Sequence, residues 1–129
     1  MSDIISTIEN MNDLTTLKAA TISQIEDAQN KLGLSFASEY KEYLEKYGAM
    51  SANSIELTGI TESKRLNVID VTIKERQRNE IPTDMYVIED TCIEGILILQ
   101  NSKGEIFEFQ KSNKINKIFN SLSDYLKSI

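Results

Sequence analysis

Apolar positions in the first half of the chain recur three or four residues apart, which is the spacing of one face of an α-helix. This pattern predicts a short opening helix within residues 3–12, a second helix at 21–32 and a third helix at 38–47. Gly33 and Gly48 follow the second and third helices, and glycine ends a helix well because it adopts a positive φ without a Cβ clash. The first half of the chain is therefore expected to be helical.

The third predicted helix carries a face of large aromatic and apolar side chains. Tyr40, Tyr43, Leu44 and Tyr47 have the spacing i, i+3, i+4 and i+7, so they share one side of the helix. We interpret this face mainly as core, since apolar stripes at helical spacing usually pack inside a protein. Tyr43 lies toward the edge of the stripe. It is our candidate for a tyrosine at the rim of a partner-binding site, because its ring is apolar and its hydroxyl is polar.

Residues 67–78 fit two kinds of secondary structure. Ile69, Val71 and Ile73 recur at every second position, as in a half-buried strand. Asn67, however, is a good N-cap for a helix, and the residues KERQRN at the end of the segment continue a helix well. We favour the helix and keep the partly extended alternative open.

The second half of the chain has the pattern of an antiparallel sheet. Short apolar runs predict strands at 55–57, 85–89, 96–99 and 105–109. The run at 96–99 is apolar throughout, which is typical of a strand covered on both faces. A lysine-rich segment then crosses back to a closing helix that begins after Ser121. Helices, then strands, then a helix is the order of an α+β fold.

The whole chain, residues 1–129, is predicted to form one α+β domain with N-terminal helices, a mostly antiparallel sheet and a C-terminal helix. A hydrophobic content of 40% and a charged content of 26% are ordinary for a globular protein of this length. No repeat, low-complexity stretch or linker marks a second unit. We expect the core of the domain at about residues 14–129, with the helix within 3–12 as a short N-terminal addition.

The charge of the chain narrows the choice of partners. A formal net charge of −6 should repel nucleic-acid phosphates and anionic membranes, and it should attract a basic protein. The main basic concentration, at 74–78, mixes positive and negative residues and lacks interleaved aromatic residues. We therefore expect neither nucleic-acid nor membrane binding. Many soluble proteins are equally acidic, so the charge fits a general role in solubility as well as a basic partner.

Several common catalytic and ligand-binding motifs are missing from the chain. The chain has no histidine, which removes the usual general base, the usual zinc ligand and the Ser-His and Cys-His pairs. Glycine-rich phosphate-binding motifs and the EF-hand loop are also absent. Chemistry with carboxylates alone has no positive support. We therefore expect a protein that is not an enzyme and that holds no cofactor and no metal.

The predicted location is the cytoplasm. Cys92 is the only cysteine, so no intramolecular disulfide can form, which fits a reducing compartment. The first residues lack the basic and apolar regions of a signal peptide. No window approaches the roughly 18 apolar residues that a membrane helix needs.

Three carboxylates crowd the predicted loop between the strands at 85–89 and 96–99. Glu89, Asp90 and Glu94 are our candidates for an acidic patch that contacts a basic protein partner. The plainer alternative is that they are solvated loop carboxylates, since surface charges usually contribute little. A site for a hard cation is a third alternative, although the spacing matches no known metal-binding loop.

The order of these elements resembles the SUKH superfamily, which groups fungal cell-wall regulators with bacterial immunity proteins. A helix that ends in LG is followed by a helix of the form xxYKxYLxKYG, and the chain closes with an apolar strand, an aromatic strand and a helix that begins S-x-x-D-Y-L. Ala37 stands where many relatives have proline, and Glu94-Gly95 only approximates their Asp-Gly pair. The residues that carry the resemblance are Ile25, Leu32, Gly33, Leu34, Tyr40, Leu44, Tyr47, Gly48, Val87, Ile88, Ile96, Leu97, Leu99, Gly104, Ser121, Tyr125 and Leu126.

The resemblance implies a binding protein. Many bacterial members are similar to immunity proteins encoded beside toxins that cells use in contact-dependent competition. Such a protein would bind a cognate toxin, often a nuclease, and would neutralise it by stoichiometric occlusion of its active site. The fungal members imply a different function, a regulatory or scaffolding module that binds several cellular partners. The immunity function predicts one tight partner and an adjacent toxin gene, whereas the regulatory function predicts several weaker partners.

Overall fold

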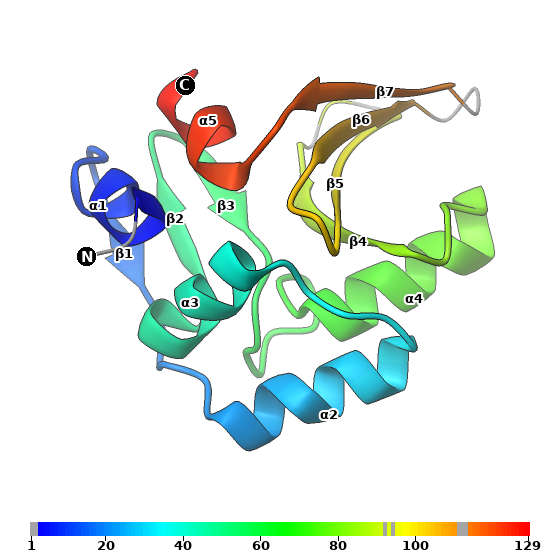
Figure 1. Ribbon diagram of the computed structural model, residues 1–129, viewed down its shortest axis with the longest axis horizontal. Coiled ribbons are helices and arrows are strands. Elements are labelled where there is room, and N and C mark those ends of the chain that lie inside the picture. Colours follow the sequence, from blue (N-terminus) through cyan, green and yellow to red (C-terminus); the bar gives the residue numbers. More distant parts are fainter. Residues whose placement is uncertain (1–2, 92, 94, 111–113) are drawn as a thin grey trace.

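The computed structural model describes residues 3–91, 93, 95–110 and 114–129 as five helices and seven strands (Figure 1). The helices are α1 (Asp3–Glu9), α2 (Ile22–Leu32), α3 (Ser38–Tyr47), α4 (Val68–Asn79) and α5 (Leu122–Lys127). The strands are β1 (Thr15–Thr16), β2 (Met50–Ala52), β3 (Ile55–Leu57), β4 (Met85–Asp90), β5 (Ile96–Asn101), β6 (Ile106–Gln110) and β7 (Lys114–Phe119). The predicted α+β class is confirmed.

The strands form two antiparallel sheets. The smaller sheet has the order β1-β2-β3 and the larger has the order β4-β5-β6-β7. Strand β4 lies beside β3, and the backbone N–H of Thr58 donates a hydrogen bond of 2.9 Å to the carbonyl of Ile88, so the two sheets meet at that point. Helix α4 runs along β4, α2 packs against α4, and α5 packs against α1 (Figure 1). Figure 1 also shows that β7 forms the outer margin of the larger sheet.

The larger sheet is buried on both faces in its central part. One face contributes Tyr86, Ile88 and Ile98 to the main core, which also contains residues of α1, α2, α3 and α5. The other face packs against α4 and forms a second core cluster; its buried residues are Val71, Ile81, Met85, Val87, Leu97, Leu99 and Phe109. Because β5 lies between β4 and β6 with both faces covered, its uninterrupted apolar sequence needs no alternation.

Helix α1 is part of the main core and is not an appendage to it. Ile4, Ile5 and Ile8 are buried in the same cluster as α3 and α5. The side chain of Lys127 in α5 also reaches the Asp3 carboxylate at 3.1 Å. The first and last helices of the chain therefore hold each other in place.

Residues 67–78 fall almost entirely in α4, so the favoured helix is confirmed and the extended alternative is wrong. The Asn67 side chain accepts hydrogen bonds from the N–H groups of Ile69 and Asp70, which caps the helix at its start. Val71 is buried against the larger sheet, whereas Ile73 remains 38% exposed. Ile73 therefore does not share the buried side of Val71, as it would in a strand whose alternate residues face the core.

Three strands were not among those that the sequence predicts. Strands β1 and β2 have only two and three residues, which is too short for an alternating pattern to show. Strand β7 has the mixed sequence KINKIF, which does not alternate strictly, and it pairs with β6 from Lys114 to Phe119. Each of these strands is extended because a neighbour supplies hydrogen bonds, and such pairing is a tertiary effect.

Two glycines let three backbone segments cross at close range near the junction of the sheets. The N–H of Ile60 donates to the carbonyl of Gly48 at 3.0 Å, and the N–H of Gly59 donates to the carbonyl of Leu66 at 2.8 Å. A Cβ on Gly59 would lie 1.7 Å from the Gly48 carbonyl oxygen, and a Cβ on Gly48 would lie 2.0 Å from the Lys18 carbonyl oxygen. Both positions therefore require a residue without a side chain.

Within the described ranges, none of the helices is long and apolar enough to cross a membrane.

Candidate functional site

Glu89 lies in β4 and is buried, so the prediction that placed it in an exposed loop is wrong. Only 5% of its surface is exposed, and its carboxylate accepts a hydrogen bond from the hydroxyl of Tyr125 in α5. A register shift in the pairing of β4 with β5 brings Glu89 opposite Ile98, which belongs to the main core. The sheet therefore turns this carboxylate inward, toward α5.

Burial is the main influence on the ionisation of Glu89. Loss of water raises the pKa of its carboxyl group above the usual value of 4.5, the Tyr125 hydrogen bond opposes this, and the charge of Asp90 adds to it. Burial and the neighbouring carboxylates of Glu89 and Glu108 raise the pKa of the Tyr125 hydroxyl. Glu89 and Glu108 thus lie close to Tyr125, and Asp90 follows Glu89 at the end of β4. We call these three carboxylates the acidic cluster.

The members of the acidic cluster differ in their access to a partner. Asp90 is the exposed end of β4, Glu108 in β6 is half-buried, and Glu89 is buried beneath Tyr125. Glu108 also accepts a hydrogen bond of 3.0 Å from the Gln110 side chain. Glu94, the remaining residue of the predicted patch, lies outside the described residues. Asp90 is therefore the carboxylate of the predicted patch that a partner protein can reach directly.

Replacing Glu89 with glutamine is expected to flatten the pH dependence of stability. Because the pKa of Glu89 is raised in the folded state, the folded protein binds this proton more tightly than the unfolded chain does. Its stabilising contribution is complete below about 4.5 and is lost as pH rises through the folded-state pKa. Denaturant unfolding at about pH 5 and about pH 7 should show wild type losing stability, relative to Glu89→Gln, as the pH increases.

The control for this measurement is Glu45→Gln, which removes one carboxylate from the exposed side of α3. It changes the net charge of the molecule by the same amount without touching Tyr125. If wild type and Glu89→Gln showed parallel stability curves over this range, Glu89 would not be the group that titrates.

Tyr43 lies in the core, so its predicted position at the rim of a site is wrong. Its side chain is 0% exposed, and its hydroxyl donates to the carbonyl of Thr58 at 2.9 Å. The hydroxyl of Tyr40 donates to the same carbonyl at 3.1 Å. These tyrosines tie α3 to the chain just after β3, which is a structural role. The main interpretation of the tyrosine face, as core, is confirmed.

A second buried network joins α3, the larger sheet and α5, and it was not among the predicted features. Gln100 is fully buried in β5; its carbonyl oxygen accepts from the Tyr86 hydroxyl at 2.7 Å. Its amide nitrogen donates to Glu39 at 3.0 Å and to the carbonyl of Gly104 at 3.1 Å. The Tyr86 hydroxyl in turn accepts from the N–H of Ala37 at 3.0 Å. This N–H exists because the residue is alanine, since proline at the same place would have none.

Glu39 connects this network to the closing helix. Its carboxylate accepts hydrogen bonds from the backbone N–H groups of Leu122 and Ser123, which are the first two residues of α5. Burial raises the pKa of Glu39, and these hydrogen bonds act in the opposite direction. A carboxylate at a helix N-terminus satisfies N–H groups that have no partner within the helix. Helix α5 is therefore held by two carboxylates, Glu39 from α3 and Glu89 from β4.

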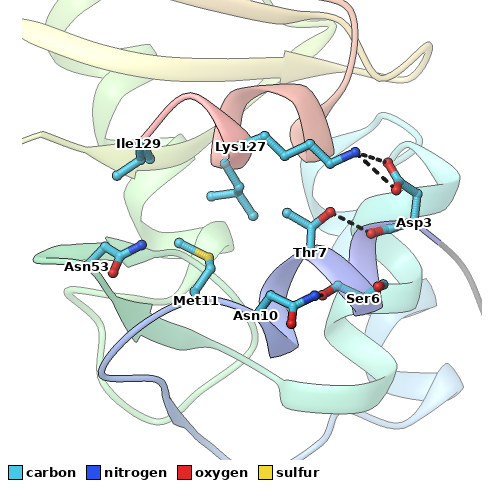
Figure 2. A pocket seen from close by; sticks show the side chains of 9 residues that line it. Asp3, Ser6, Thr7, Asn10, Met11, Asn53, Lys127 and Ile129 are labelled. Atoms are coloured by element: carbon cyan, nitrogen blue, oxygen red, sulfur yellow. Dashed lines mark hydrogen bonds and ion pairs between the residues drawn. The ribbon is translucent and has the colours of Figure 1, made fainter.

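A hollow of about 460 Å³ lies between α1, α5 and the β2–β3 turn (Figure 2). Figure 2 shows the Asp3 carboxylate paired with Lys127, the Thr7 hydroxyl bonded to the Asp3 carbonyl and the Asn10 amide directed at the Ser6 carbonyl. The charged groups that line this hollow thus pair with each other. Among the described side chains that line the hollow, Asp3 and Lys127 are the charged ones and they pair with each other, so we place no binding site here.

Metal binding has no support in the geometry. In the described part of the chain, no three carboxylate or cysteine side chains come together in a way that could hold an ion. The three members of the acidic cluster do not make such a group, because Glu89 is directed inward at Tyr125.

The family model described as SMI1-KNR4 cell-wall, of the SUKH group, matches residues 1–129. The chain belongs to the SUKH family. A crystal structure of a protein from Pseudomonas syringae pv. tomato is similar to this SUKH chain, with a TM-score of 0.79 and 12% sequence identity. The match covers 100% of this chain and 97% of the other. At that level of identity the similarity shows the fold. A search of the curated proteins found no match.

The network of Glu39, Tyr86 and Gln100 depends on tertiary packing. Glu39, Tyr86 and Gln100 come from three separate elements, and Gln100 is an ordinary polar residue at the end of an apolar run. A signal was present in part: a glutamine that continues a run of buried residues indicates either an edge of the core or a buried hydrogen-bonding group. Only the packing of α3 and α5 on the sheet shows that Gln100 is a buried hydrogen-bonding group.

Proposed function

We propose that this protein is an immunity protein that binds a basic toxin domain, of the nuclease kind, and neutralises it by stoichiometric occlusion. The observation that carries the proposal is the acidic cluster, in which Asp90 is exposed beside a buried and oriented carboxylate, Glu89. Membership of the SUKH family supports a function in protein binding in general.

The charge of the whole molecule supports the same kind of partner. A nuclease holds phosphates with lysine and arginine, so its active site presents a positive field. A protein with a net charge of −6 is attracted to that field, and electrostatic steering of this kind can speed association considerably at low ionic strength. Carboxylates of the binding protein would then occupy the positions that substrate phosphates need.

The contact surface that we propose is centred on Asp90 and includes Glu94. Glu89 contributes from beneath: its hydrogen bond to Tyr125 fixes the end of β4 relative to α5. A binding residue that is held before the partner arrives loses less conformational entropy on association. Tyr43 is not part of the proposed contact, because it is buried.

Replacing Asp90 with lysine is expected to weaken binding of the cognate toxin domain that we propose, mainly through an association rate that is about tenfold slower. The toxin domain would be expressed in a sensitive host with and without this protein, and survival would be scored. Stopped-flow or surface-based kinetics on the purified one-to-one complex would then give the rates. Thermal unfolding of the variant separates loss of binding from loss of folding.

The matched control is Glu45→Lys, which makes the same change in net charge on the exposed side of α3. An equal loss of binding in both variants would mean that only total charge matters and that Asp90 is not at the interface. Absence of rescue by the wild-type protein would count against the immunity function itself.

The second candidate function is a regulatory or scaffolding module, and the cell-wall description of the matching family favours it. Such a module would bind several partners with lower affinity and would have no toxin gene beside its own. Affinity purification from the native cells distinguishes the two functions, since one dominant partner supports immunity and several substoichiometric partners support regulation.

A further inference from the structure

The outer strands of the two sheets differ in how much backbone they leave unpaired. Strand β1 has only two residues. The outer side of β4 is covered: Val87 N–H donates to the Thr72 hydroxyl at 3.1 Å, and the Val87 carbonyl accepts from the Thr58 hydroxyl at 2.7 Å. Strand β7, by contrast, has six residues and, among the described strands, pairs only with β6. It is the one long edge that the described sheets leave open.

The residues of this edge are accessible. The first four residues of β7 are exposed, and β7 lies at the outer margin of the sheet (Figure 1). An unpaired edge presents a row of backbone N–H and carbonyl groups that a further strand can bond. Recognition domains that accept an extended peptide use such edges, with main-chain hydrogen bonds for affinity and alternate side chains for specificity.

The side chains of the edge define what kind of strand it fits. Lys114 and Lys117 give β7 two positive charges, and the sequence of β7 contains no acidic residue. The Lys117 ammonium contacts the Glu105 carboxylate at 2.8 Å, while Ile115 is 37% exposed opposite Phe109. A cross-strand neighbour would thus meet lysines and one apolar side chain, and carboxylates opposite lysines stabilise strand pairing.

We propose that β7 receives an extended, acidic segment of another protein, which adds a fifth strand to the larger sheet. Charge complementarity is the reason for this choice. A second copy of this chain would bring two more lysines to the same ladder. An acidic segment avoids this lysine–lysine repulsion, and Lys114 is the lysine with which it would pair, because Lys117 already contacts Glu105.

This inference is independent of the proposed toxin contact. Asp90 lies at the end of β4, and β4 and β7 are the opposite edges of the four-stranded sheet. A toxin centred on Asp90 and an acidic strand on β7 would therefore occupy different edges of the sheet. Failure of one proposal leaves the other standing.

The test uses the full chain, labelled with ¹⁵N, and two end-blocked synthetic peptides of equal length. One peptide alternates glutamate with valine, and the other has lysine in place of glutamate. We expect the acidic peptide to shift the amide signals of residues 114–119 and to slow hydrogen exchange at those β7 amides that face away from β6, while the lysine peptide does neither. Lys114→Glu should weaken binding of the acidic peptide about fivefold or more.

Lys46→Glu is the matched control, because Lys46 is an exposed lysine on α3, far from β7 in the chain. It changes the net charge by the same amount as Lys114→Glu. The acidic peptide should shift the β7 amide signals of this variant as it does in the wild type. Several results would overturn the proposal. These are equal binding of the two peptides, protection at elements other than β7, and no binding of the acidic peptide at millimolar concentration. Protection of β7 that rises with protein concentration and without peptide would identify a second copy as the occupant instead.

Discussion

Replacing Gly59 with alanine is expected to destabilise the protein by about 3 kcal/mol or more, because the added methyl group has no space. Its Cβ would lie 1.7 Å from the carbonyl oxygen of Gly48 and 2.9 Å from the Cα of Ala49. Both are backbone atoms, so no side-chain rotation relieves the overlap. The loop must move away, and the 3.0 Å hydrogen bond from the Ile60 N–H to the Gly48 carbonyl would be lost.

Denaturant unfolding followed by circular dichroism measures this effect, and the thermal midpoint should fall on the order of 10 °C. Gly33→Ala is the control: Gly33 has φ of +66° and nothing within 4 Å of an added Cβ. That variant should lose only about 1 kcal/mol, from the left-handed backbone conformation. Equal losses in the two variants would show that the segments move apart around the added methyl group at little cost.

Replacing Gln100 with leucine is expected to cost about 3 kcal/mol, because it removes three hydrogen bonds from the interior and leaves the Tyr86 hydroxyl without an acceptor. The Tyr86 hydroxyl would lose its acceptor, and the Gly104 carbonyl and the Glu39 carboxylate would each lose a donor. Leucine has about the right size and is apolar, so the loss would come from unsatisfied hydrogen bonds and not from a cavity. Denaturant unfolding measures the free energy.

The matched control is Gln110→Leu in the neighbouring strand β6. Gln110 is half-buried, and its amide donates to Glu108 at 3.0 Å at a position that water can reach. That variant should change stability by less than about 1 kcal/mol. If Gln100→Leu were as mild as the control, the network of Tyr86, Gln100 and Glu39 would not be needed to hold the sheet to α3 and α5.

The buried acids show where interpretation of the sequence alone reached its limit. Glu89 follows four buried residues of β4, and a carboxylate at the end of a strand is normally assigned to the following loop. The register shift between β4 and β5 turned it inward, and Tyr125 from α5 supplied a donor. A β-bulge redirects side chains without any distinctive residue in the sequence. Glu39 is a similar case, since its partners in α5 lie more than 80 residues away along the chain.

The sequence by itself determined the elements that have their own periodicity or capping residues. Helices α2, α3, α4 and α5, the central strand β5 and the hairpin to β6 follow from apolar spacing, from Thr21, Asn67 and Ser121 as N-caps of α2, α4 and α5, and from glycines at turns. These features are local, because each helical face or turn depends on residues within a few positions of one another.

Only the tertiary structure decided the properties that depend on contacts between distant segments. Strands β1, β2 and β7 exist because of their neighbours, Tyr43 is buried because Thr58 and α3 meet, and Glu89 is turned inward by the pairing of two strands. Whether a polar side chain reaches solvent or a buried partner depends on which segment covers it. In this protein that segment is α5 for both Glu39 and Glu89, and α5 is almost the last part of the chain.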